Sequence, residues 1–399
     1  MLTSLAFVFL AGLAAAAVCS AVKLPRIIGM LLVGIVLGPH VLNVLDDSIL
    51  SISSDLRQMA LIIILIKAGL SLNLSDLKHV GRPAVLLSCL PATCELAGYV
   101  LLAPHLLGVS RIEAAVMGAV LAAVSPAVVV PRMVSLMENR WGTEKSIPQM
   151  LLAGASCDDI YVIVLFTTFT GIAQGGSAKA TDFLNIPVSV VLGIAVGAAV
   201  GLALAKFFES AFAHNHMVRG SVKVIIVLSV SFLLVALESA LKGKLALSGL
   251  LAVTSMACML ARKTEGKVRA RLSEKFGKLW IAAELILFVL VGAAVDIRYA
   301  AETGLAAVLM IFAALIFRAA GVVLCVAGTQ LNRRERIFCV IAYLPKATVQ
   351  AAIGSVPLAM GLPCGEIVLS VAVLAILITA PLGAFGMDAT YRKLLKQKR

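Results

Sequence analysis

The sequence predicts an all-α polytopic membrane protein. Hydrophobic residues make up 61% of its 399 residues and charged residues only 14%, whereas a soluble domain carries about 25% charged residues. The mean hydropathy is +1.05. A membrane-spanning helix needs about 20 apolar residues, so a chain of this length has room for about a dozen spans joined by short loops.

Apolar runs between polar breaks predict thirteen transmembrane helices. The first run resembles a signal peptide, but it lacks the basic start that such peptides carry, and we expect it to be a membrane helix. The predicted spans are 3–22, 24–38, 57–72, 82–104, 112–137, 148–173, 185–209, 220–240, 245–262, 277–296, 302–328, 335–357 and 365–386.

The basic residues predict the orientation. With the N-terminus outside and the C-terminus inside, most of the 34 Lys and Arg residues fall in inside segments, as the positive-inside rule requires. These loops face an anionic lipid leaflet, which accounts for the net charge of +13. The lipid bilayer is therefore the expected partner, and no nucleic acid is expected.

Several charged residues fall inside the predicted spans, where each costs about 2.5–3.5 kcal/mol at a helix centre. Lys67 and Glu284 lie near helix ends, where a long side chain can reach the membrane surface. The deeper ones are Glu95, Asp158, Asp159, Arg318 and Lys346. Such residues normally face the interior of a helix bundle and mark an ion or proton path.

Two predicted spans contain prolines that we expect to break the helix. Pro126 and Pro131 lie in the fifth span, and Pro345 lies in the twelfth, with Thr348 and Gln350 close by. Each proline removes a backbone donor and frees a carbonyl one turn earlier. A simple kink is the alternative, because proline kinks are common in membrane helices.

The two broken helices occupy matching places in two five-helix blocks, roughly 24–173 and 245–386, and so do Glu95 and Arg318. Because five is an odd number, the second block enters the membrane with the opposite orientation. The pattern predicts two inverted five-helix repeats with crossed broken helices. In secondary transporters, repeats of this kind place half-helix ends and freed carbonyls around an ion site at the midplane.

The adjacent Asp158 and Asp159 are the predicted cation ligands. A carboxylate can replace the hydration shell of a hard cation, which prefers oxygen ligands, or it can bind a proton instead. Neighbouring residues on a helix point about 100° apart, so we expect the two aspartates to have different roles. Freed carbonyls near Val124 and Val128 and the hydroxyls of Ser125 and Ser156 would complete the cation's shell.

Five short motifs carry a resemblance to a known family. The segments "SPAVVVP", "SCDDI" and "LPKATVQAAIG" resemble those of the monovalent cation:proton antiporter superfamily, and most of all its NHA-type sodium/proton antiporters and their bacterial relatives. "LPATCELAGYV" and "FRAAG" are similar to the same branch. The resemblance covers about residues 20–390.

The resemblance implies a thirteen-helix Na⁺/H⁺ antiporter-like fold, a homodimer and a bacterial inner (cytoplasmic) membrane location. It also implies an ion-transporting core domain, 82–173 and 302–386, that moves against a dimerisation domain, 1–72 and 220–296. Residues 185–209 would be a linker helix, and residues 387–399 would be a basic cytoplasmic tail.

Residue by residue, the resemblance makes Asp159 the ion-binding aspartate and Asp158 its neighbour. The segment 125–131 would be the first unwound crossover, and the segment 344–352 the second, with Lys346 facing it.

Arg318 stands where electrogenic relatives use a lysine paired with the first aspartate, which leaves the stoichiometry open. Those relatives suggest Asp158 as its partner, whereas the repeat suggests Glu95, which we favour.

The predicted function is secondary active transport. Na⁺ or Li⁺, with K⁺ as a further candidate, would be exchanged for protons by alternating access, in the service of pH homeostasis and without a resident cofactor. The alternative is a sodium-coupled symporter of an organic anion, but few polar groups are present to bind such a solute. An aspartyl protease needs two aspartates on facing helices, whereas Asp158 and Asp159 are neighbours, so we expect no enzyme.

Overall fold

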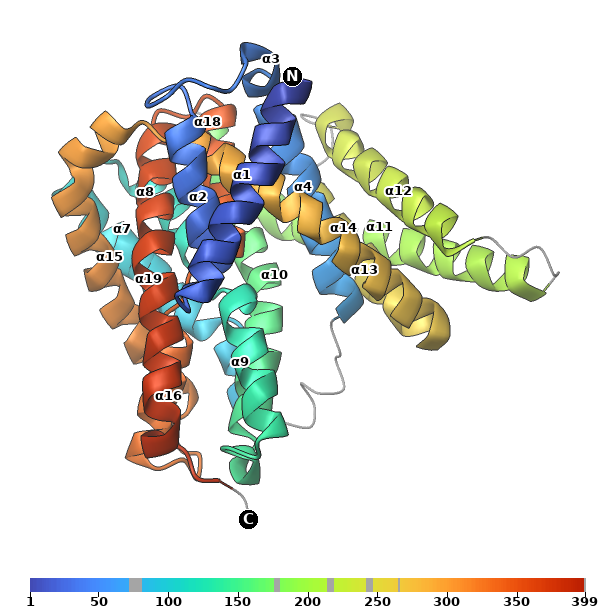
Figure 1. The fold of residues 1–399 in the computed structure, drawn as a ribbon. Helices are drawn as coiled ribbons and strands as arrows, with labels where there is room; N and C mark the ends of the chain where they lie inside the picture. Colours follow the sequence, from blue (N-terminus) through green and yellow to red (C-terminus); the bar gives the residue numbers. More distant parts are fainter. Residues whose placement is uncertain (72–80, 176–179, 214–218, 242–246, 265, 398–399) are drawn as a thin grey trace. The chain divides into compact units, whose positions relative to one another are not determined.

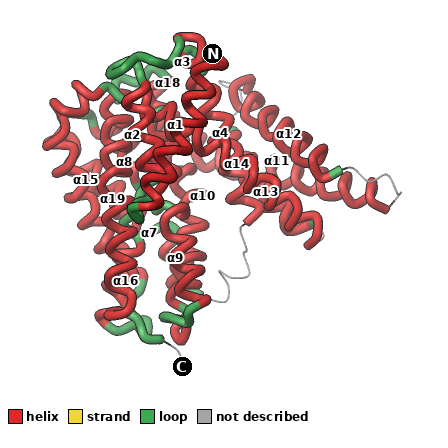
Figure 2. Tube along the Cα trace, in the orientation of Figure 1, coloured by secondary structure: helices red, strands yellow, loops and turns green. Residues whose placement is uncertain are grey.

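The computed structural model describes residues 1–71, 81–175, 180–213, 219–241, 247–264 and 266–397. Apart from an isolated β-bridge between Trp141 and Gln397, the regular structure in these ranges is helical, which confirms the all-α class (Figure 2). Each of the thirteen predicted spans overlaps a described helix. Within the described ranges, nine helical stretches are long and apolar enough to cross a membrane.

The chain forms two compact units (Figure 1). The first unit contains residues 1–54, 73–174 and 287–399. Its helices are α1 (Leu2–Ala21), α2 (Arg26–Leu37), α3 (Asp47–Leu50), α6 (Arg82–Leu87), α7 (Leu90–Leu107), α8 (Arg111–Leu121), α9 (Pro126–Glu138), the 3₁₀ turn η1 (Thr143–Lys145), α10 (Ile147–Gln174), the end of α14 (Gly266–Ala293), α15 (Ile297–Cys325), α16 (Arg333–Ala342), α17 (Thr348–Gly354), α18 (Val356–Ala359) and α19 (Gly365–Leu394).

The second unit contains residues 55–72 and 175–286. Its helices are most of α4 (Ser53–Ser71), α11 (Ala180–Ala213), α12 (Gly220–Leu241), α13 (Gly249–Lys263) and most of α14 (Gly266–Ala293). Helices α11 and α13 pack so closely that a Cβ at Gly197 would come within 2.2 Å of the Ala252 carbonyl oxygen. Small residues at such contacts are how membrane helices bring their backbones together.

In the first unit, α7 and α15 lie side by side (Figure 1). Gly98 on α7 faces the Phe317 ring, and Gly321 on α15 faces the backbone of Pro91. This close approach brings Glu95 on α7 opposite Arg318 on α15. The outer side of α15 exposes apolar side chains, Leu305 at 76% and Ile316 at 71%, as lipid-facing residues do.

The two broken helices begin in the same way. Ser110 caps α8 and Asn332 caps α16, and in each case a glutamate three residues later completes a capping box, Glu113 and Glu335 respectively. Each box satisfies backbone donors that a helix start leaves free. The local sequence therefore sets the first residue of both half-helices.

The boundaries of the spans differ from the predictions at several places. Helix α14 begins at Gly266, well before the predicted 277. Its first turns are helical but rich in Lys and Arg, so a prediction from apolar runs did not include them. The predicted tail is helical up to Leu394, and the predicted span 82–104 is interrupted at Ser88–Cys89. A hydropathy pattern reports where a chain is apolar, and a helix continues or stops for other reasons.

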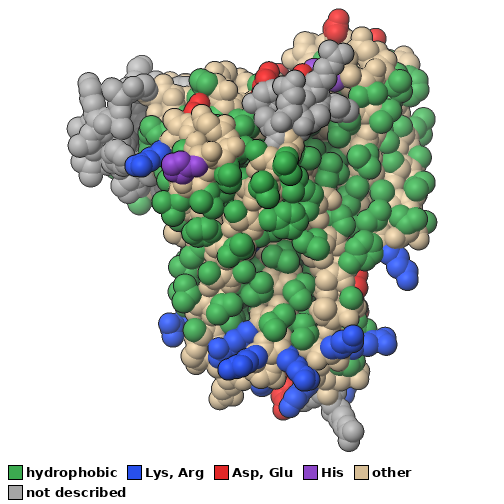
Figure 3. Space-filling model, turned by 90° about the vertical axis from the view of Figure 1, so that its left-hand side faces the viewer, with side chains coloured by type: hydrophobic (Ala, Val, Ile, Leu, Met, Phe, Trp, Pro, Cys, Tyr) green, Lys and Arg blue, Asp and Glu red, His purple; other side chains and the backbone are tan. Residues whose placement is uncertain are grey.

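On the face drawn in Figure 3, hydrophobic side chains cover the middle, and Lys and Arg side chains gather at the end where the C-terminus lies. An apolar band above a basic end is typical of a membrane protein whose basic loops face an anionic leaflet.

Candidate functional site

Two interrupted helices meet at the centre of the first unit. Helix α8 ends at Leu121 and α9 starts at Pro126, while α16 ends at Ala342 and α17 starts at Thr348. The two breaks are in direct contact: the Ser125 N–H donates a 2.8 Å hydrogen bond to the Pro345 carbonyl. The sequence predicted both interruptions at the prolines.

The extents of both breaks were predicted wrongly. The first break lies at 122–125, before Pro126, because proline is favoured at the first helical position, where an N–H has no partner within the helix. Pro131 lies inside α9 without ending it, as membrane helices tolerate. The second break ends at Ala347, so the segment from Thr348 to Ala352 is helical.

Val128 is a poorer cation ligand than predicted. It lies in α9, and its carbonyl accepts a 3.1 Å hydrogen bond from Arg132 Nη1. It is therefore not a carbonyl freed by the break.

The end of α8 is capped by three side chains from other parts of the chain. The carbonyls of three successive residues, 121 to 123, accept hydrogen bonds from Lys346 Nζ, Arg318 Nη1 and Gln350 Nε2 respectively. The C-terminal end of a helix carries partial negative charge, which the two cations balance. These carbonyls are thus already occupied.

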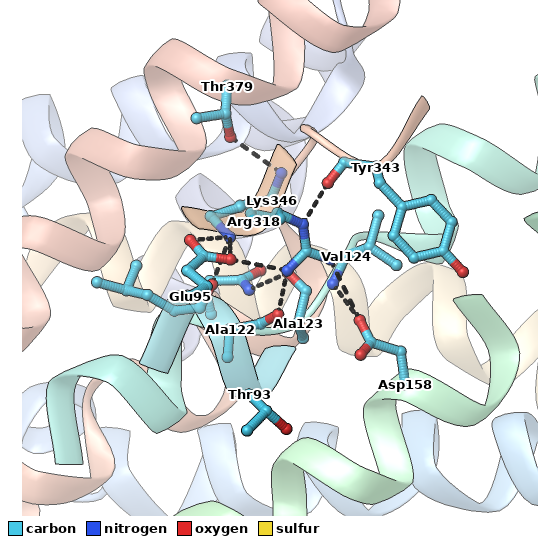
Figure 4. A network of polar contacts seen from close by, with 12 residues as sticks. Thr93, Glu95, Ala122, Ala123, Val124, Asp158, Arg318, Tyr343, Lys346 and Thr379 are labelled. Carbon is cyan, nitrogen blue, oxygen red and sulfur yellow. Dashed lines mark hydrogen bonds and ion pairs between the residues drawn. The ribbon is translucent and has the colours of Figure 1, made fainter. Parts of the chain in front are cut away.

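Four buried charges form a connected network (Figure 4). Glu95 Oε2 lies 2.7 Å from Arg318 Nη1, and its Oε1 lies 2.7 Å from Lys346 Nζ. Arg318 Nη2 also lies 3.4 Å from Asp158 Oδ2. The structure thus places both candidate partners against Arg318, with Glu95 at the shorter distance. Lys346, which was expected at the second crossover and in support of the core ion pair, is bound to Glu95.

Asp158 is held on one side only. Its Oδ2 accepts a 2.7 Å hydrogen bond from the Val124 N–H, and the same oxygen faces Arg318. Its Oδ1 is buried without a hydrogen-bond partner. Asp158 therefore has a fixed carboxylate with one free oxygen.

Asp159 differs from the other deep charges. Its side chain is 7% exposed, and its Oδ1 is buried and unpartnered, as is the Ser125 hydroxyl. In the described part of the chain, Asp159 forms no ion pair. A buried carboxylate without a partner is costly, so this group needs a proton or a cation.

The remaining predicted residues fall in different places. Thr348 is buried at the start of α17, whereas the side chain of Ser156 lies outside the described structure.

Sequence reasoning missed two residues. The Tyr343 carbonyl accepts a hydrogen bond from Arg318 Nε, and its ring lies 5.6 Å from the guanidinium. Thr379 Oγ1 accepts a 3.0 Å bond from the Lys346 N–H. An isolated threonine within the apolar run of α19 was an available signal for Thr379.

Comparison with known proteins places the chain in a family. The family model "Sodium/hydrogen exchanger, transmembrane" matches residues 5–390. Sodium/hydrogen exchanger 9B2 of Homo sapiens is 36% identical over 386 residues, which are 94% of this chain and 70% of that protein. Human sodium/hydrogen exchanger 9B1 is 32% identical over 398 residues, which are 93% of this chain and 73% of that protein.

The fold has a counterpart among solved structures. The sodium proton antiporter MjNhaP1 from Methanocaldococcus jannaschii, solved at pH 8, superposes with a TM-score of 0.81 at 22% identity. The match covers 98% of this chain and 99% of that chain.

The comparisons confirm cation/proton antiport as the function of the family and give no support to a symporter. They place the chain among transporters, in agreement with the expectation that it is no enzyme. The sodium/hydrogen exchangers named above are human, so they do not support a bacterial inner membrane. The chain is a multi-pass membrane protein of the sodium/hydrogen exchanger family.

Proposed function

We propose that the protein exchanges Na⁺ or Li⁺ for protons by alternating access, with Asp159 binding either the cation or the proton. The observation that carries the proposal is the charge balance of the site. Glu95 and Asp158 offset Arg318 and Lys346, so the network is neutral without Asp159. Asp159 is thus the deep charge whose compensation must come from a transported ion.

The free oxygens supply the rest of the cation's shell. Asp158 Oδ1, Asp159 Oδ1 and the Ser125 hydroxyl are buried and unpartnered, and hard cations bind oxygen. The Val124 carbonyl and the Ser156 hydroxyl remain candidates beside them. The choice among Na⁺, Li⁺ and K⁺ depends on the size of the space that these oxygens leave for the cation.

Competition for one carboxylate couples the two fluxes. An ionised Asp159 binds the cation and a protonated Asp159 does not, so each passage carries one species or the other. Because Asp158 already faces Arg318 and accepts a hydrogen bond from the Val124 N–H, we assign the change of charge to Asp159 alone. The proposed exchange is therefore electroneutral.

The proposal includes the wider organisation. The two inverted repeats are supported by the two matching helix breaks. The apolar runs and the basic residues support thirteen spans with the N-terminus outside, and the homodimer rests on the resemblance alone. A core of 82–173 and 302–386 would move against a dimerisation domain of 1–72 and 220–296, with 185–209 between them. Location in a bacterial cytoplasmic membrane and a role in pH homeostasis rest on the resemblance alone.

A flux experiment tests the proposal. The purified protein is placed in vesicles that hold a pH gradient, and Na⁺, Li⁺ and K⁺ are added in turn while a dye reports internal pH. Na⁺ or Li⁺ should dissipate the gradient, and Asp159→Asn should abolish the effect. The control is Glu366→Gln, which neutralises an exposed acid in the first turn of α19. Uptake of an organic anion with Na⁺, without proton movement, would overturn the proposal.

A further inference from the structure

The Gln350 side chain joins the two helix breaks. It is fully buried. Its Oε1 accepts a 2.8 Å hydrogen bond from the Ala347 N–H in the second break, and its Nε2 donates a 2.8 Å bond to the Ala123 carbonyl in the first. One amide thereby satisfies a donor and an acceptor that the two interruptions leave free.

The Ala123 carbonyl belongs to the same peptide group as the Val124 N–H. That N–H donates to Asp158 Oδ2 at 2.7 Å. A peptide group is planar, with its carbonyl and N–H on opposite sides, so Gln350 holds one side of the plane while Asp158 holds the other. Rotation of this peptide would break both bonds together.

We infer that Gln350 is a positioning residue that sets cation affinity by fixing the Ala123–Val124 peptide. The inference rests on the proposed function. With the peptide fixed, Asp158 stays bound through Oδ2, and its unpartnered Oδ1 stays beside the transport aspartate on α10. Ser125, the next residue along the break, supplies the unpartnered hydroxyl.

Loss of the amide bonds would act on binding before it acts on turnover. Without Gln350, the peptide can turn, and the carboxylate of Asp158 and the hydroxyl of Ser125 lose their fixed positions. A looser set of ligands binds a cation less tightly, because the cost of ordering them is then met at each binding event. A purely structural amide would instead affect stability alone.

The test compares Gln350→Met with Ser355→Ala. Methionine matches the length of the side chain but makes neither hydrogen bond. Ser355 is also buried, at the end of the same helix α17, so its variant controls for the loss of a buried polar group. In proteoliposomes, the KM for Na⁺ and Li⁺ and the kcat are measured for each variant, and the thermal midpoint is measured in detergent.

The KM of Gln350→Met should rise about tenfold, as expected for the loss of one or two hydrogen bonds, while kcat changes less and Ser355→Ala keeps the wild-type KM. A wild-type KM in Gln350→Met with a lowered thermal midpoint would make the residue structural only. In that case wild-type exchange still stands. Absence of exchange in the wild type would overturn the proposed function itself.

If Gln350→Met folds poorly, a second variant and a measurement of cation binding test the inference instead. An ionised Gln350→Glu still accepts from the Ala347 N–H but cannot donate to Ala123. Stabilisation of the purified protein by added Na⁺ reports binding without flux. In the Gln350→Glu variant, the midpoint of this titration should lie at a Na⁺ concentration about tenfold higher than in the wild type. An unshifted titration would refute the inference, as would failure of both Gln350 variants to fold while Ser355→Ala folds.

Discussion

Removing the Glu95 carboxylate should destabilise the protein strongly. Glu95 contacts two cations at 2.7 Å, Arg318 and Lys346, and each of the three side chains is at most 1% exposed. Glu95→Gln leaves both cations buried with Asp158 as the remaining acid of the network. Breaking a buried ion pair on one side costs roughly 3–5 kcal/mol, which is a large share of the 5–15 kcal/mol that is typical of folded proteins.

The loss should be recovered in part by removing one cation. Glu95→Gln combined with Lys346→Met leaves Arg318 facing Asp158, so the network is neutral again. The double variant should therefore lose much less than the sum of the single losses, as residues in one network do. Asp158→Asn should cost less than Glu95→Gln, because its contact with Arg318 is longer, 3.4 Å, and its amide oxygen can still accept from Val124.

Thermal unfolding of the purified variants in detergent, without Na⁺ or Li⁺, measures these differences. Glu366→Gln, which alters an exposed acid, should unfold at the wild-type temperature. A Glu95→Gln variant as stable as the wild type would refute the reasoning, and so would a double variant whose losses simply add.

Two further predictions concern the packing around the site. Gly154→Ala should lower stability by about 1–3 kcal/mol through overpacking, because the new Cβ would lie 2.2 Å from the Tyr343 hydroxyl and 2.8 Å from Leu87 Cβ. Tyr343→Phe in the same chain should recover part of that loss, and an additive double variant would contradict this contact. Asp388→Asn should change the thermal midpoint little, because its ion pair with Arg132 is partly exposed, at 56% and 24%, and such pairs contribute about 0–1 kcal/mol. A large loss in Asp388→Asn would show that this pair is worth more than its exposure indicates.

The sequence was sufficient to predict the helices, the places of the two breaks and the deep charges that the structure brings together. Long apolar runs are costly to leave in water, so their helices follow from composition. The deep charges Glu95, Arg318, Lys346 and Asp158 could be predicted to lie together, because a charge in a membrane needs a partner. Pro126 and Pro345 indicated the breaks because proline cannot donate a backbone hydrogen bond.

The hydrogen bonds of the site could not be predicted from the sequence. Which carbonyls at the end of α8 remain free depends on the side chains that reach them, and Gln350 is 227 residues away from Ala123. Val128 was predicted as a ligand because the prolines of the fifth span were expected to free carbonyls near it, but only the position of the break relative to Pro126 decides whether its carbonyl is free. The two partners of Arg318 likewise depend on how α7, α10 and α15 pack.

The role of Asp159 is tested most directly by proton release on cation binding. Na⁺ or Li⁺ is added to the purified protein in weakly buffered detergent solution, and a pH indicator measures the protons released. The proposed exclusive binding at Asp159 predicts that protons are released in equal amounts to the cation bound, and that Asp159→Asn neither binds the cation nor releases protons. Cation binding without proton release in the wild type, or unchanged release by Asp159→Asn, would contradict it.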